Sequence, residues 1–125
     1  MSLVARHLEE NGLPTVVIGS ARDIVEECGV PRFLFSDFPL GNPCGVPYDR
    51  EMQRAIVGMA LDLLESATLP RTTVQTPFVW DGGNEDWKDA YARVDEGNRE
   101  ALRRQGEARR AAQERSKAEG RTRRT

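Results

Sequence analysis

Apolar and polar positions along the chain alternate between strand-like and helix-like spacing. Around residues 15–19 and 32–36, β-branched and aromatic side chains follow one another without polar alternation, which is typical of strands buried on both faces of a parallel sheet. Residues 72–76 are again rich in β-branched side chains and predict a third strand. Because helical spacing separates these runs, we expect right-handed βαβ units. The sequence therefore predicts an α/β fold with a small, mainly parallel sheet of three to four strands flanked by helices.

The most regular helical pattern covers about residues 50–67. Asp49 stands at the position of an N-cap, and Pro70 follows the end of the pattern. The apolar stripe of this helix consists of Met52, Ile56, Met59, Ala60, Leu63, Leu64 and Ala67. A shorter helix is predicted after Ser20, because Asp23 follows three positions later as in a capping box. We expect the longer helix to pack on the sheet.

A long irregular segment, residues 36–49, joins the second predicted strand to this helix. Its three prolines and two glycines exclude regular structure and restrict the backbone closely. A loop of this length inside a compact domain is usually functional. It also follows the carboxyl end of a parallel strand, which is where open α/β sheets place their sites. The alternative interpretation is a rigid turn, stabilised by an asparagine side chain, that only connects a strand to a helix.

Several residues of this loop have side chains or backbone groups that suit ligand binding. Gly41 lets the backbone approach a ligand closely, and Asn42 can both donate and accept hydrogen bonds. Asp37 supplies a carboxylate for an amine or a proton. Just before the second strand, Arg32 is a candidate for binding a substrate carboxylate, with a surface ion pair as the alternative.

Cys44 is the candidate nucleophile of the loop. Loop amides or the N-terminus of the helix that begins after Asp49 would lower the pKa of its thiol. It has no Cys-x-x-Cys partner and no neighbouring histidine, so an incidental loop cysteine is the alternative. We interpret Cys28 as a buried small hydrophobe. His7, the only histidine, is interpreted as a boundary residue of an amphipathic first helix rather than as a base or a ligand. No phosphate loop, zinc signature or dinucleotide fingerprint is present, so the sequence predicts no metal and no cofactor.

Charge divides the chain unevenly. Residues 98–125 carry ten Lys or Arg and four Asp or Glu, a net charge of +6, whereas the first 97 residues carry −8. The acidic body argues against nucleic acid as a partner. The basic tail has Leu102 as its only aliphatic residue larger than alanine, so we expect a solvated helix or a disordered tail.

The division into regions follows from the same distribution. We predict an α/β domain over residues 1–80 and a C-terminal helix with a basic tail over 81–125, anchored through Trp87, Tyr91 and Val94. No apolar run approaches the ~20 residues of a membrane span. Charged side chains within the first ten residues argue against a signal peptide. We therefore expect a cytoplasmic protein without a membrane partner.

Four segments together resemble one protein family. They are Gly-Leu-Pro-Thr-Val-Val at 12–17, Gly-Val-Pro-Arg at 29–32, Pro-Leu-Gly-Asn-Pro at 39–43 and the helix over 49–64. This series resembles the C-terminal portion of the selenoprotein B subunits of glycine, sarcosine and betaine reductases, and also the related subunit of D-proline reductase. The resemblance covers roughly residues 3–80, and the Pro-Leu-Gly-Asn-Pro run is its most specific part.

The resemblance implies a role in reductive chemistry. Members of this family cleave a C–N bond reductively, with a selenolate attacking the substrate carbon, and their selenocysteine lies just upstream of the segment that matches residues 4–14. The chain lacks that motif, so the resemblance implies a subunit of a hetero-oligomeric reductase, inactive alone, that contributes a substrate-side loop for a small molecule. A sister subunit would carry the redox-active cysteine or selenocysteine. The alternative is a non-catalytic partner that stabilises or regulates a sister enzyme.

Overall fold

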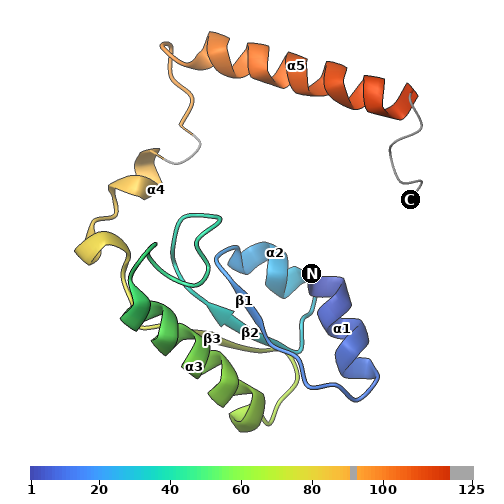
Figure 1. The fold of residues 1–125 in the computed structure, drawn as a ribbon, viewed down its shortest axis with the longest axis vertical. Coiled ribbons are helices and arrows are strands. Elements are labelled where there is room, and N and C mark those ends of the chain that lie inside the picture. The colour runs from blue at the N-terminus through green and yellow to red at the C-terminus, as the bar shows by residue number, and fades with distance from the viewer. Residues whose placement is uncertain (91–92, 119–125) are drawn as a thin grey trace. The chain divides into compact units, whose positions relative to one another are not determined.

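The computed structural model describes residues 1–90 and 93–118. The chain forms two compact units, Met1–Tyr91 and Ala92–Thr125, and each is described by itself. The first unit contains the sheet and most of the helices (Figure 1). The predicted division of the chain at residue 80 stays a prediction.

The core of the first unit is a three-stranded, wholly parallel sheet. Its strands are β1 (Val17–Gly19), β2 (Arg32–Phe35) and β3 (Thr72–Gln75). They lie in the order β1-β2-β3, with Ile18 beside Leu34 and Leu34 beside Val74. The predicted small, parallel α/β fold is therefore confirmed.

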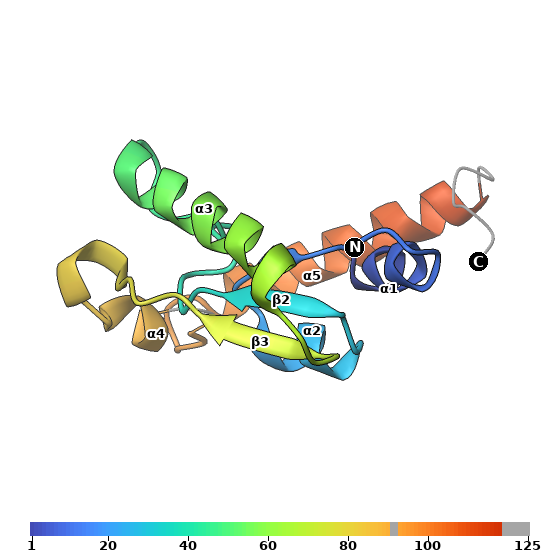
Figure 2. The same cartoon turned by 90° about the horizontal axis from the view of Figure 1, so that it is seen from below.

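Helices cover both faces of this sheet. The helical elements of the first unit are, in chain order, α1 (Ser2–Glu10), α2 (Arg22–Glu27), α3 (Arg50–Ser66), the 3-10 turn η1 (Trp80–Gly83) and α4 (Asp86–Ala90). Figure 2 shows α3 on one face of the sheet and α2 on the other. Leu34 of β2 packs in the core under α3, whereas its neighbours Phe33 and Phe35 pack with Ala5 of α1 and Val30 on the opposite face. β2 is thus buried, as its unbroken apolar run predicts, and it is the central strand of the sheet.

β1 is less buried than the sequence predicts. All three of its residues are half-buried, because β1 is an edge strand with a neighbour on one side only. The same alternation of side chains that buries β2 on both faces therefore leaves β1 partly open.

Helix caps give one confirmed prediction and one correction. The Asp49 side chain accepts a hydrogen bond from the backbone N–H of Met52 at 3.0 Å, as expected of an N-cap. The predicted capping box of Ser20 and Asp23 is wrong. α2 begins one residue later, with Ala21 at its N-cap and no side-chain cap. Asp23 therefore stands at the second helical position, where it cannot close the box.

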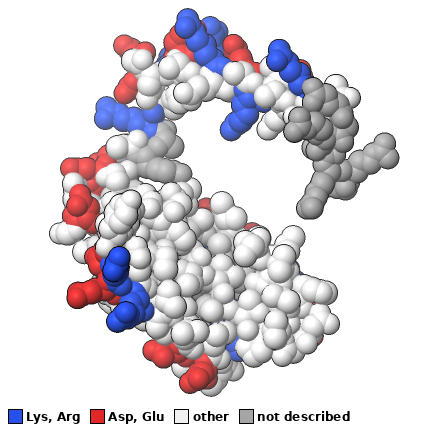
Figure 3. All heavy atoms as spheres, in the orientation of Figure 1, with Lys and Arg blue, Asp and Glu red and all other residues white. Residues whose placement is uncertain are grey.

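The second unit contains α5 (Arg99–Ala118), a helix without a buried residue. Arg103 and Arg104 both contact Glu100, at 2.9 and 3.3 Å. Basic and acidic side chains are interspersed over this helix (Figure 3). A solvated helix, one of the two forms expected for the tail, is what residues 99–118 adopt, while 119–125 lie outside the described residues.

The three residues predicted to anchor the last helix to the body differ in their burial and position. Trp87 is half-buried, Val94 is 59% exposed and belongs to the second unit, and Tyr91 lies outside the described residues. Trp87 therefore remains as the anchor within the first unit. Over residues 1–90 and 93–118, no helix is both long and apolar enough to cross a membrane.

Candidate functional site

The carboxyl ends of the three strands are fastened together by hydrogen bonds. The N–H of Ser36 donates to the carbonyl of Gly19 at 3.0 Å, and the N–H of Thr76 donates to Phe35 at 2.8 Å. The hydroxyl oxygens of Ser36 and Thr76 lie 3.0 Å apart and are hydrogen-bonded, and both residues are buried. Because these buried polar groups satisfy one another, the first residue of the long loop is held firmly against the sheet.

Asp37, the next residue, lines a cavity of about 220 Å³ beside the end of β3. The lining residues are Asp37, Gln75, Phe78, Val79, Trp80, Gly83, Asn84, Glu85, Trp87 and Lys88. Lys88 of α4 donates a hydrogen bond from Nζ to Asp37 Oδ2 at 2.7 Å and another to Glu85 Oε1 at 2.9 Å. The cavity is therefore closed on one side by an ion pair that joins α4 to the loop.

The charge state of this pair follows from its contacts. The hydrogen bond to Asp37, followed by that to Glu85, raises the pKa of Lys88 above its usual value. Lys88 is therefore an ammonium at neutral pH. A ligand that enters the cavity meets a hydrogen-bond donor and an acceptor side by side.

Phe78 and two tryptophans, Trp80 and Trp87, form the aromatic part of the cavity wall. The Trp80 ring lies 5.4 Å from the ring of Phe38, which is only 1% exposed, and the Lys88 ammonium lies 5.7 Å from the Trp87 ring. η1 turns the chain between these residues, and its Asp81 has a left-handed backbone with φ of 46°. The sequence prediction missed Lys88 and both tryptophans as site residues. The turn-forming run at 80–84 was the available signal, because it shows that the chain reverses there.

The Pro-Leu-Gly-Asn-Pro run at 39–43 forms a tight turn and follows Asp37 closely in the sequence. The N–H of Asn42 donates to the carbonyl of Pro39 at 3.1 Å, and the Asn42 side-chain amide approaches the same oxygen at 3.5 Å. Gly41 has a φ of +94°, and a side chain there would meet no atom within 4 Å. The turn is thus closed mainly by this backbone hydrogen bond, with only a long contact from the asparagine side chain, and it presents Gly41 to open space. Ligand binding by Gly41 and Asn42 stays a prediction.

Cys44 packs against the core rather than lining the Asp37 cavity. It is half-buried and contacts the apolar cluster that contains Leu34 and Ile56. Gly41, Asn42 and Cys44 are not among the described residues that line the cavity. The structure therefore does not bring Asp37 and Cys44 into one pocket, and a nucleophilic role for Cys44 stays a prediction.

The remaining candidate, Arg32, lies at the other end of the strands, at the amino end of β2. It is the first residue of β2, whereas Asp37 follows the end of that strand. Its Nη1 donates to both carboxylate oxygens of Glu9, at 2.7 and 2.8 Å, and Glu9 also accepts from the N–H of Thr15 at 2.7 Å. This geometry is that of an ion pair, the alternative to substrate binding that the sequence left open for Arg32. A role for Arg32 in substrate binding stays a prediction.

The Glu9–Arg32 pair predicts a specific pH dependence of stability. The hydrogen bond from Arg32 lowers the pKa of Glu9 below the usual 4.5, although partial burial of the carboxylate acts to raise it. A carboxylate with a lowered folded-state pKa adds stability above its unfolded pKa and loses it as the pH falls through the folded pKa. We therefore expect Glu9→Gln to reduce stability at neutral pH and to flatten the acid limb of urea-unfolding stability measured from pH 7 to pH 3. An acid limb identical to that of the wild type would contradict this.

Comparison with known proteins gives one informative match. The chain is 33% identical over 76 residues to D-proline reductase subunit gamma of Acetoanaerobium sticklandii. The match covers 61% of this chain and 31% of that protein, so the chain spans less than a third of the relative's length. No family model matches, and no solved structure matches either. The match supports a distant relation to the proline/glycine reductase family, while the narrower resemblance to selenoprotein B stays a prediction.

Proposed function

We propose that this chain is a subunit of a reductase complex of the proline/glycine reductase type. In this proposal it contributes the loop over residues 36–49 to the substrate side of the active site, and a partner chain supplies the redox-active thiol or selenol. The observation that carries the proposal is the 33% identity over 76 residues to a subunit of D-proline reductase. A small molecule containing a C–N bond is the substrate class.

The position of the loop supports this role. It begins at the carboxyl ends of β2 and β3, where parallel sheets place their ligands, and it starts with Asp37 in a cavity of about 220 Å³. Gly41 faces open space a few residues later. Asp37 and Lys88 offer an acceptor and a donor side by side to polar groups of a substrate, while the turn at 39–43 presents backbone to a partner's reacting group.

The placement of the two cysteines supports a partner as the source of electrons. Reductive cleavage of a C–N bond takes two electrons, which a thiol or selenol pair supplies as it is oxidised to a disulfide or selenosulfide. Both cysteines of this chain are free: Cys28 ends α2 on one side of the sheet, and Cys44 packs in the cluster under α3 on the other. They are therefore not arranged as a redox pair, and the proposed pair belongs to the partner.

One observation favours the alternative of a non-catalytic, stabilising subunit. Asp37 already has a partner within the chain, because Lys88 lies 2.7 Å from its carboxylate. An ion pair of this kind can simply fasten α4 to the loop. The two functions differ in what a change at the loop does to turnover, which the next experiment measures.

Asn42→Ala is expected to lower turnover by the complex about tenfold or more, with little loss of stability. The side chain of Asn42 makes only a 3.5 Å contact to Pro39, so its removal costs the fold little. The complex is isolated through an affinity tag on this chain, and its kcat/KM is measured with a dithiol as reductant.

Asn11→Ala is the matched control. Asn11 is exposed at the end of α1, and its side chain donates a shorter hydrogen bond to His7 at 2.8 Å. This variant loses more hydrogen bonding than Asn42→Ala, yet it should retain wild-type turnover. Equal turnover by all three proteins would favour the non-catalytic role.

A further inference from the structure

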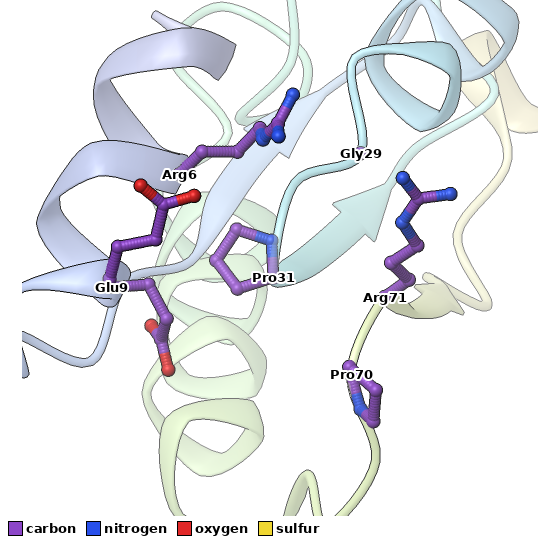
Figure 4. A pocket seen from close by; sticks show the side chains of 7 residues that line it. Arg6, Glu9, Gly29, Pro31, Pro70 and Arg71 are labelled. Carbon is purple, nitrogen blue, oxygen red and sulfur yellow. The ribbon is translucent and has the colours of Figure 1, made fainter.

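A second hollow lies at the amino ends of the strands, apart from the Asp37 cavity. It encloses about 240 Å³ between α1, the turn after α2 and the start of β3. Its lining residues are Arg6, Glu9, Glu10, Gly29, Pro31, Pro70 and Arg71. Figure 4 shows Arg6 and Arg71 reaching toward the turn at Gly29 from the two sides of Pro31. Nothing in the proposed reductase function uses these residues.

Arg71 is held here in a strained conformation. Its φ is +54°, in the left-handed region that residues with a side chain rarely adopt. Its guanidinium lies over Gly29, where a β-carbon would stand 2.7 Å from Arg71 Nη2. Gly29 therefore provides the room that the guanidinium occupies. Backbone strain that places a charged group in this way is characteristic of binding sites.

Most hydrogen-bond donors of the two arginines have no partner within the described residues. Arg6 donates once, from Nη1 to the carbonyl of Cys28 at 3.3 Å, and Arg71 forms neither a hydrogen bond nor an ion pair there. Each guanidinium carries five N–H donors. One N–H donor of Arg6 is used to cap the end of α2 at Cys28. The other donors of both guanidinium groups are available to a ligand.

The nearby carboxylates do not cancel this positive charge. Glu9 is already engaged by Arg32 at 2.7 Å, and Arg32 does not line the hollow. Glu10 is the one other acidic residue of the lining, against two arginines. The rigid rings of Pro31 and Pro70 complete the wall. An acceptor-only group therefore fits the hollow better than a cation does.

We propose that this hollow binds an oxyanion, the phosphate or carboxylate group of a small molecule, through forked hydrogen bonds from Arg6 and Arg71. The planar guanidinium matches both oxyanions with two parallel N–H···O bonds. The site is independent of the reductase proposal, because it lies at the amino ends of the strands and shares no lining residue with the Asp37 cavity.

The test is an NMR titration of the full chain with inorganic phosphate and, separately, with acetate, at constant ionic strength set by chloride. We expect saturable shifts of the backbone amides of Gly29 and Arg71 with at least one of the two anions. Tighter binding of phosphate identifies a phosphate ligand, and tighter binding of acetate identifies a carboxylate. In Arg71→Gln the apparent Kd should rise about tenfold or more.

Two further variants make the result decisive. Gly29→Ala should also weaken binding, because its β-carbon displaces the Arg71 guanidinium. Arg54→Gln is the matched control, since Arg54 is an exposed arginine of α3 outside the hollow, and it should bind as the wild type does. Shifts that fail to saturate with either anion, or that are equal in Arg71→Gln and the wild type, would overturn the proposal.

Discussion

Phe38→Ala is expected to lower the free energy of unfolding by about 3–5 kcal/mol, the range for removing a buried phenylalanine. Phe38 is 1% exposed, packs in the cluster with Leu34 and Ile56, and contacts the Trp80 ring at a centroid distance of 5.4 Å. Small domains are stable by only about 5–15 kcal/mol, so this loss is a large part of the total. Urea unfolding followed by tryptophan fluorescence measures it.

Tyr48→Ala is the matched control for this change. Tyr48 is an aromatic residue of the same loop, but it is 98% exposed. Its φ of 67° is strained with either side chain, so the backbone cost is the same in both proteins. We expect its effect to stay within about 0.5 kcal/mol. If Phe38→Ala proved as mild as Tyr48→Ala, the loop would not be anchored in the core as described.

The anchoring of Phe38 also matters for the site. It is the residue after Asp37, and its backbone N–H donates to Ser36 at 2.8 Å. The loop therefore enters the core immediately beyond its candidate acidic residue. This fixes where the Asp37 carboxylate points before any ligand arrives.

The fold was predictable because its signals are local. The unbroken apolar run of β2 and the apolar stripe with its Asp49 cap identify a buried strand and α3 from neighbouring residues alone. The capping box predicted at Ser20 was wrong although its pattern is also local. A cap depends on backbone angles that a four-residue pattern does not determine, and the chain enters α2 one residue later.

The site was less predictable because its contacts join distant parts of the chain. Asp37 was identified from its place after a strand, but its partner Lys88 comes 51 positions later. Arg32 was proposed as a carboxylate-binding residue from its place just before the second strand. Arg32 and Asp37 lie at opposite ends of β2. Arg32 forms its ion pair with Glu9, which stands 23 positions earlier in the chain. Neither pairing has a spacing that sequence alone reveals.

The central expectation of the proposed function is that the chain turns over no substrate alone. Its two free cysteines belong to different sides of the sheet, so neither can resolve an intermediate formed on the other. A partner thiol or selenol would do the covalent chemistry next to the loop at 36–49. Loss of the partner should therefore abolish activity rather than reduce it, the largest catalytic effect that we predict.

The most direct test compares steady-state turnover by the purified chain with that of the complex isolated through a tag on it. Each is assayed with a dithiol reductant and with D-proline, glycine, sarcosine and betaine in turn. The Cys44→Ser variant is measured in both forms. We predict turnover of at least one substrate by the complex and none by the lone chain. Robust turnover by the lone chain, abolished by Cys44→Ser, would contradict the partner model and identify Cys44 as the nucleophile.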